Sequence, residues 1–171
     1  MTAYNYGSAV AFLPEVEIDT ADAAQAVHAA DLDGDSDLDI LSASLDDDTV
    51  GWYRNDLSTS GAFVAQTPIS TVSGSGPRSV YAKDLDGDTD LDVLAVFSGN
   101  HDVVWYENDS GSFVPHTIDS DAGNPRSVFA ADLDGDTDQD VLVASFGGDK
   151  IYSYANDGSG VSDRAAASLR A

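Results

Sequence analysis

A nine-residue acidic string occurs three times in the chain and constrains its fold more than any other feature. It reads DLDGDSDLD at Asp31–Asp39, DLDGDTDLD at Asp84–Asp92 and DLDGDTDQD at Asp132–Asp140. The copies start 53 and 48 residues apart. Self-similarity at a period of this size is typical of solenoids, propellers and other repeat arrays. We therefore expect three copies of one structural unit.

The similarity continues on both sides of the string. Before it stand AAQAVHAA, GPRSVYAK and NPRSVFAA, and after it stand DILSASL, DVLAVFS and DVLVASF. Next come TVGWYRND, DVVWYEND and KIYSYAND, and then, in the first two copies only, GAFVAQTPI and GSFVPHTI. These short runs are rich in β-branched and aromatic residues and are separated by Gly, Asn, Asp and Ser, which predicts strands. Four antiparallel strands per repeat of this length predict one blade of a β-propeller.

The repeat boundaries predict an all-β chain of three four-stranded antiparallel blades. We expect blade 1 at 21–70, blade 2 at 71–120, and blade 3 at 121–160 without its outer strand, followed by a tail at 161–171. Residues 1–20 contain an additional run, AVAFLPEVEI, that resembles an outer strand. We expect it to complete a blade, and that blade can belong to a partner chain.

Three blades are too few to close a ring, because propellers usually have four to eight. An open arc exposes apolar faces and strand edges, which favours association. We expect closure by homo-oligomerisation, with six blades in a dimer. A nine-blade trimer and a fragment of a longer chain are the alternatives.

The acidic strings are candidate metal sites. Carboxylates at alternating positions of a tight turn repel one another strongly unless a cation lies between them. A hard cation with six to eight oxygen ligands resolves this repulsion, and Ca²⁺ suits it better than Mg²⁺, which keeps its waters. A solvated acidic turn is the simpler alternative, but three copies between strand patterns disfavour it. The candidate metal-binding residues are Asp31, Asp33, Asp35, Asp37, Asp39, Asp84, Asp86, Asp88, Asp90, Asp92, Asp132, Asp134, Asp136, Asp138 and Asp140.

The repeat DLDGDxDxDVL, followed by the WYEND and GSFVPHTI runs, resembles the FG-GAP/VCBS family, which builds integrin α-type and microbial secreted β-propellers. The resemblance implies one Ca²⁺ per blade, three per chain, in the hairpin between the first two strands. It implies side-chain ligation by the first, third, fifth and ninth loop residues and ligation by the seventh backbone carbonyl, which belongs to Asp37, Asp90 or Asp138. The sixth position is often Gly in the family but is Ser36, Thr89 or Thr137 here, a strained choice if φ is positive.

Charge and composition exclude several classes of partner. With 31 acidic and 7 basic residues the net charge is −24, which argues against nucleic acid as a partner. No apolar run approaches the ~18 residues that suggest a membrane-spanning helix, so we expect no membrane insertion. There is no cysteine, so disulfides and thiolate sites are excluded. The segment Met1–Val10 lacks the basic and apolar regions of a signal peptide.

These features favour a non-enzymatic, calcium-stabilised module for recognition or adhesion outside the cell or at its surface, with a protein or glycan ligand. The resemblance supports this class, and no catalytic motif is present. The alternatives are the propeller part of a secreted polysaccharide-degrading enzyme and a purely structural repeat segment of a larger secreted protein. Trp52, Tyr53, Trp105 and Tyr106 are expected in the core between blades. Arg78 and its repeat equivalent Arg126 are expected to pair with acidic loops, or else to hold an acidic ligand at a channel mouth.

Overall fold

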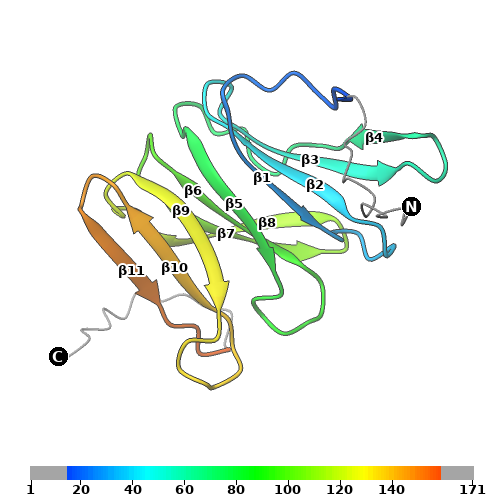
Figure 1. The fold of residues 1–171 in the computed structure, drawn as a ribbon. Helices are drawn as coiled ribbons and strands as arrows, with labels where there is room; N and C mark the ends of the chain where they lie inside the picture. The colour runs from blue at the N-terminus through cyan, green and yellow to red at the C-terminus, as the bar shows by residue number, and fades with distance from the viewer. Residues whose placement is uncertain (1–14, 159–171) are drawn as a thin grey trace, which may run out of the picture.

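A computed structural model describes residues 15–158 of the chain (Figure 1). The described residues form eleven strands in three antiparallel sheets and contain no helix. The first sheet contains β1 (Ala24–Ala30), β2 (Asp39–Ser44), β3 (Thr49–Asp56) and β4 (Ala62–Ala65). The second contains β5 (Pro77–Lys83), β6 (Asp92–Phe97), β7 (Val103–Asp109) and β8 (Ser112–Asp119). The third contains β9 (Pro125–Ala131), β10 (Asp140–Ser145) and β11 (Lys150–Tyr154). The expected all-β, antiparallel architecture is confirmed.

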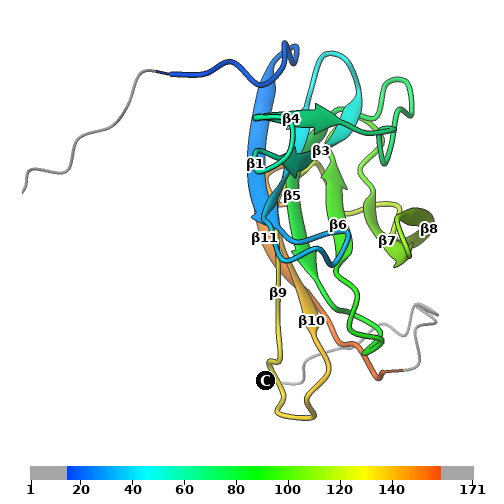
Figure 2. The same cartoon turned by 90° about the vertical axis from the view of Figure 1, so that its right-hand side faces the viewer.

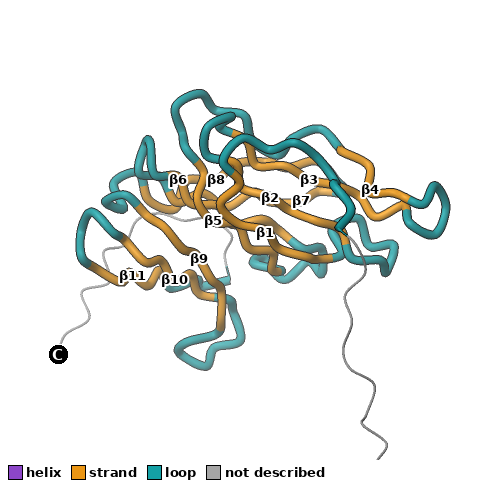
Figure 3. The backbone as a smooth tube through the Cα atoms, turned by 45° about the horizontal axis from the view of Figure 1, so that its top comes forward, coloured by secondary structure: helices purple, strands orange, loops and turns teal. Residues whose placement is uncertain are grey.

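The sheets stand side by side as an open arc. The innermost strands β1, β5 and β9 are neighbours, since β5 contacts both β1 and β9. From β5 the second sheet extends outward through β6 and β7 to β8 on the opposite side of the molecule (Figure 2). Loops join the strands at both ends of each sheet (Figure 3). Among the described residues the arc does not close into a ring.

Burial explains why the strand runs are apolar on both sides. Every residue of β6, the second strand of the middle sheet, is buried, because neighbouring sheets cover both of its faces. One apolar cluster fills the junction between the first and second sheets and includes Leu41, Val50 and Val93. A second cluster fills the junction between the second and third sheets and includes Leu94 and Val103. Sheets packed face to face around an inner edge are the arrangement of propeller blades.

The expected extra strand at 1–20 falls mostly outside the described residues. Its described part, residues 15–20, forms no strand, so exchange of this segment with another chain stays a prediction. The expected tail at 161–171 lies outside the described residues altogether. Within residues 15–158, nothing helical is long and apolar enough to cross a membrane.

Candidate metal centres

Each acidic string forms the loop that connects the first two strands of a sheet. The first loop follows β1 at Ala30 and ends where β2 begins at Asp39. The second and third loops connect β5 to β6 and β9 to β10 in the same way. The repeat therefore places three chemically equivalent acidic loops at equivalent positions in successive sheets.

Three carboxylates converge in each loop. In the first and third loops these belong to the first, third and fifth residues, and in the second loop to the first, third and ninth. Within each group, one oxygen from every residue lies within 4.8 Å of the others. The three groups are Asp31, Asp33 and Asp35; Asp84, Asp86 and Asp92; and Asp132, Asp134 and Asp136. The structure thus brings together nine of the fifteen candidate side chains, in groups that can hold a metal ion.

Hydrogen bonds inside the loop aim the carboxylates inward. In the second loop the amide of Asp88 donates to Asp86 Oδ1 over 3.1 Å, and the amide of Asp90 donates to Asp88 Oδ1 over 2.9 Å. The amides of Gly87 and Thr89 donate to the two oxygens of Asp84. The third loop repeats all four bonds and the first loop repeats three of them. The backbone thus wraps around the carboxylates, so the sequence pattern dictates one loop conformation.

The sixth position of each loop has a left-handed backbone. The φ angles of Ser36, Thr89 and Thr137 are 75°, 84° and 87°. Such angles are strained for a residue with a Cβ, and most of all for β-branched threonine. The expectation that these residues are strained if φ is positive is therefore confirmed. The tight loop therefore holds these three residues in a backbone conformation that they would not ordinarily adopt.

The ninth aspartate anchors each loop to its sheet. Asp39, Asp92 and Asp140 are 0%, 1% and 2% exposed. Asp39 Oδ1 accepts the amide of Asn55 at 2.8 Å, and its Oδ2 accepts the indole N–H of Trp52 at 2.9 Å. In the other two sheets the corresponding Asn amides, of Asn108 and Asn156, make the same bond over 2.9 Å. This carboxylate therefore ties the loop to the third strand.

The carboxyl pKa values report crowding and burial. Burial raises the pKa of Asp92 to about 6, against the opposing hydrogen bonds from the amides of Asn108 and Leu85. Burial, with repulsion from neighbouring carboxylates, also raises the pKa of Asp33 and of Asp86. Each loop region therefore resists carrying its full negative charge alone, which a bound cation would relieve.

A second observation also indicates that these oxygen ligands suit a hard cation. The Oδ1 atom of Asp31 is buried and has no hydrogen-bond partner among the described residues. A buried carboxylate oxygen without a donor is costly unless a cation compensates it. Its neighbours in the first loop are the carboxylates of Asp33 and Asp35, which are oxygen donors of the kind that Ca²⁺ prefers.

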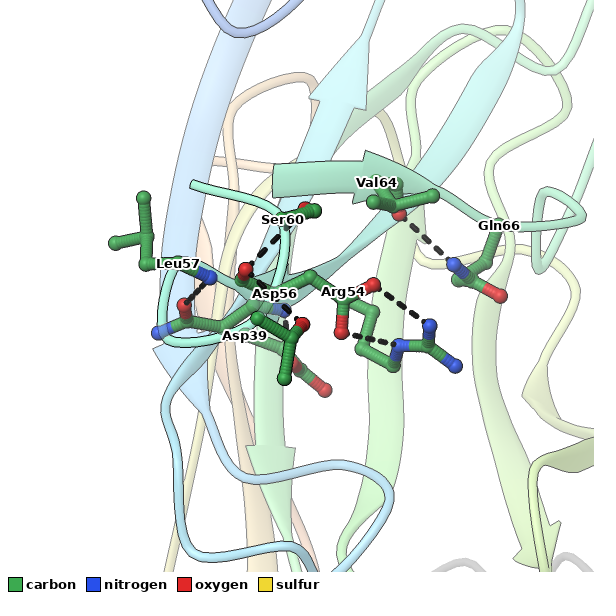
Figure 4. A network of polar contacts seen from close by, with 9 residues as sticks. Asp39, Arg54, Asp56, Leu57, Ser60, Val64 and Gln66 are labelled. Carbon is green, nitrogen blue, oxygen red and sulfur yellow. Dashed lines mark hydrogen bonds and ion pairs between the residues drawn. The ribbon is translucent and has the colours of Figure 1, made fainter. Parts of the chain in front are cut away.

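The residue beside the acidic loop differs between sheets: it is Arg54 in the first, Glu107 in the second and Ala155 in the third. Next to the first loop Arg54 pairs with Asp56 over 2.7 Å (Figure 4), and the charges of Asp33 and Asp35 also act on its guanidinium. The equivalent residue in the second sheet is Glu107, whose charge adds to the repulsion on Asp86. Glu107 contacts the ring of His116 at 2.8 Å. The three loops are thus alike in geometry but not in electrostatic surroundings.

The asparagine of the third strand has a role that we do not predict from the sequence. The Nδ2 group of Asn108 donates to the carbonyl of Leu91 in its own sheet and to that of Leu32 in the preceding loop. An asparagine is the next-to-last residue of TVGWYRND, DVVWYEND and KIYSYAND. This recurrence is the sequence pattern that could have indicated its role.

Two other expectations have different outcomes. The four aromatic residues Trp52, Tyr53, Trp105 and Tyr106 are at most 9% exposed, so their expected place in the core is confirmed. The expected pairing of Arg78 and Arg126 with acidic loops is not found as a direct contact among the described residues, whose ion pairs are Arg54–Asp56 and His116–Glu107. The charge of Asp46 in the neighbouring acidic turn does act on Arg78. Arg78 instead bonds Ser98 and Gln25, and Arg126 bonds Asn124.

Comparison with known proteins agrees with the repeat geometry. The model of the FG-GAP-like repeat matches the chain twice, over residues 32–95 and 84–143. Together the two matches cover more than half of the chain and include most of all three acidic loops. No curated protein matches the chain significantly. The chain belongs to the FG-GAP-like repeat family.

Proposed function

We propose that the chain is a non-enzymatic, calcium-binding β-propeller module that acts in recognition or adhesion outside the cell or at its surface. The observation that carries the calcium proposal is the convergence of three carboxylates in the equivalent loop of three successive sheets. One acidic cluster is common on protein surfaces. A cluster repeated at one place in each sheet, around a strained loop, favours a common ligand.

The chemistry of the donors favours Ca²⁺ over other cations. Each group offers carboxylate oxygens and no sulfur or imidazole ligand, which disfavours zinc and copper. Ca²⁺ accepts six to eight oxygens at about 2.3–2.6 Å in flexible geometry, whereas Mg²⁺ needs a regular octahedron and keeps several waters. The side chains of the first, third, fifth and ninth residues and the seventh carbonyl would supply such an oxygen-rich shell.

We infer that the role of calcium is structural. Each loop joins two strands of a sheet, and its ninth aspartate is buried against the third strand. At a free Ca²⁺ concentration of about 100 times the dissociation constant, one site stabilises the folded state by about 2.7 kcal/mol, and three sites by about 8 kcal/mol. That is similar to the whole stability of a typical domain. Sites of this kind suit the calcium concentrations found outside cells.

The recognition proposal is supported by two neighbouring arginines. Arg78 and Arg126 begin the adjacent inner strands β5 and β9, and neither pairs with a carboxylate among residues 15–158. Burial and then the positive charge of Arg126 lower the pKa of Arg78, against the opposing charge of Asp46. Two adjacent cations on so acidic a chain favour acidic groups of a protein or glycan ligand.

Two other functions compete with this proposal. A propeller that belongs to a secreted polysaccharide-degrading enzyme would need acid–base groups outside the metal loops. The best-placed pair is Glu107 and His116, but the His116 ring is stacked on Trp105 with centroids 4.6 Å apart. A structural segment of a larger secreted protein would bind calcium and no ligand. Turnover of acidic polysaccharide favours the first alternative, and a lack of any ligand favours the second.

Thermal unfolding tests the calcium proposal. We expect the melting temperature to be well above its value in chelator when Ca²⁺ is millimolar, and to rise much less in equal Mg²⁺. The variant with Asp31→Asn, Asp84→Asn and Asp132→Asn should lose most of the calcium response. The matched control is Asp46→Asn, Asp109→Asn and Asp121→Asn, which changes the charge equally outside the loops. Equal melting temperatures in calcium and chelator would contradict the proposal.

Binding to an array of acidic glycans and acidic peptides tests the recognition proposal. We expect binding that requires calcium and that falls at least about tenfold, or about 1.4 kcal/mol, in the double variant Arg78→Ala and Arg126→Ala. The control variant Lys150→Ala removes a cation from the outer part of the third sheet. If both variants bind alike, the arginines have no part in recognition.

A further inference from the structure

The two junctions between neighbouring sheets are built from the same contacts. Asn108 at the end of β7 donates from Nδ2 to the carbonyl of Leu32 in the preceding loop, over 2.9 Å. Asn156, which follows β11, donates to the carbonyl of Leu85 in the same way, over 2.7 Å. Each junction therefore joins an asparagine of the later sheet to an acidic loop of the earlier one.

Apolar side chains of the earlier sheet are sealed at both junctions. The second residue of the loop is 3% exposed at Leu32 and 6% exposed at Leu85. The second residue of the TVGW and DVVW runs is fully buried, at Val50 and at Val103. These positions are buried because the next sheet covers them.

The third sheet presents the same positions to solvent. Leu133, equivalent to Leu32 and Leu85, is 50% exposed, and Ile151, equivalent to Val50 and Val103, is 81% exposed. The hydrogen bonds of the described residues include none from a side chain to the Leu133 carbonyl. The outer face of the third sheet is thus half of a junction, and no sheet formed by residues 15–158 supplies the other half.

The first sheet carries the complementary half. Val27 is 73% exposed, whereas the equivalent residues Val80 and Val128 are each 5% exposed because an earlier sheet covers them. Asn55 is the equivalent of Asn108, and its Nδ2 donates to Leu38 in its own loop. A bond to a preceding loop, which Asn108 and Asn156 both make, is absent for Asn55 among the described residues.

The far end of the first junction offers one more contact that the end sheets could repeat. The carboxylate of Asp48 accepts the amides of Gly74 and Gly76 ahead of β5, at 2.6 and 2.9 Å. Asp149 holds the equivalent position in the third sheet and is exposed. Ala23 is the equivalent of Gly76 and shares its left-handed backbone, with φ of 54° against 57°.

We propose that a second copy of this chain docks head to tail on these two faces, the third sheet of one copy against the first sheet of the other. The contact continues the junction already present twice within the chain, and one sequence supplies both halves. It would join the Leu133 carbonyl to Asn55 of the partner copy and seal Ile151 and Val27. Because both ends are used, two copies close a ring of six sheets, within the usual range for propellers.

The segment before β1 leaves part of this face accessible. Residues 19–21 line a small cavity with Ser44, Gly51 and Tyr53 on the same side of the first sheet. That cavity lies toward the turn between β2 and β3, whereas Asn55 lies at the opposite end of β3. Val27 on the inner strand stays exposed. The segment therefore covers the Ala23 end of the face, where Ser42 and Tyr53 are 5% and 8% exposed. It leaves Val27 and the Asn55 end uncovered, so a second copy has to displace it only at the covered end.

Sedimentation velocity in millimolar Ca²⁺ tests the contact. We expect a mass of twice 17.8 kDa for the wild type. Ile151→Asp and Val27→Asp should each raise the dimer dissociation constant at least about a hundredfold, because each places a charge in a dry junction. Asn55→Ala and Asp149→Ala should weaken it less. The matched control is Val114→Asp, which changes a valine that is 46% exposed on the outer strand of the middle sheet.

A mixture of variants tests the head-to-tail arrangement. Ile151→Asp and Val27→Asp chains keep one intact face each, so equal amounts should form a heterodimer through one wild-type junction although each alone is monomeric. A monomeric wild type would overturn the proposal, and so would loss of the dimer by Ile151→Asp with none by Val27→Asp. A trimer or filament would overturn the two-copy ring. The inference rests on sheet packing, so a monomer with an intact calcium response leaves the calcium proposal standing.

Discussion

Individual residues in the acidic loops combine two properties that ordinary surface turns lack. Their carboxylates converge within 4.8 Å, and the sixth residue keeps a left-handed backbone at Ser36, Thr89 and Thr137. The charge repulsion costs free energy unless a cation is bound, and the backbone strain costs free energy whether or not one is bound. The converging carboxylates and the strained sixth residue are therefore the strongest argument for a bound metal ion.

The pKa of Asp92 predicts how the metal-free fold depends on pH. Burial raises this pKa to about 6 in the folded state, from the ordinary value of 3.8 that applies to the unfolded chain. The folded state thus holds a proton that the unfolded state has lost, so this stabilisation is present below about pH 4 and is lost as pH rises to about 6. We expect the unfolding free energy in chelator to fall over this range.

The Asp92→Asn variant is the comparison for this effect, because it cannot titrate. Its unfolding free energy should fall less steeply than that of the wild type between about pH 4 and 6. Denaturant titration at each pH, in chelator, measures both slopes. Identical slopes in the two proteins would refute a raised pKa at Asp92.

Backbone strain at Thr89, where φ is 84°, predicts an unusual gain from glycine. Thr89→Gly removes the Cβ that opposes a left-handed backbone, and the calcium-loaded protein should gain about 1 kcal/mol. Thr89→Ala keeps a Cβ and should gain little. Denaturant unfolding in millimolar Ca²⁺ measures both. A Gly variant no more stable than the Ala variant would argue against strain at this position.

Among the elements, the third strand of each sheet joins the loop, the sheet and the junction. The amide of Asn108 donates to Asp92, while its side chain reaches the carbonyls of Leu32 and Leu91 and accepts the amide of Gly111. Asn108 is 1% exposed. One buried asparagine therefore couples two acidic loops from neighbouring sheets.

Removal of this coupling predicts a large loss of stability. Asn108→Ala leaves two carbonyls and one amide without their bonds in a buried place, which should cost about 2–4 kcal/mol. Asn55→Ala should cost less in the isolated chain, because Asn55 makes no bond to another sheet among the described residues. Asn100→Ala, at an exposed turn, is the control. Denaturant unfolding of the three variants gives the order, and equal losses at Asn108 and Asn55 would contradict it.

The strands and the acidic loops were predictable because the same local sequence pattern recurs in each repeat. The run DVLAVF is apolar at successive positions, and the structure buries all of β6 between two sheets. The roles of Asn108 and Leu32 were not predictable, because both depend on which sheet lies next along the arc. The bonds of Arg78 to Ser98 and Gln25 were not predicted either, because its charge suggested a carboxylate partner.

At the scale of the whole molecule, residues 15–158 form an arc whose first and third sheets each have a face that no other described sheet covers. The two internal junctions bury Leu32 and Leu85, whereas Leu133 stays half exposed. The net charge of −24 opposes both folding and association, since like charges repel within the chain and between copies. Three bound Ca²⁺ ions would reduce this repulsion, so the account links calcium to the fold and to ring closure.

The central claim is that the three loops bind calcium, and a calorimetric titration of the metal-free chain tests it most directly. We predict three Ca²⁺ ions per chain, with heat that Mg²⁺ at the same concentration does not reproduce. The variant with Asp31→Asn, Asp84→Asn and Asp132→Asn should lose that heat. Absence of binding at millimolar Ca²⁺, or an unchanged stoichiometry of three in the triple variant, would contradict the account.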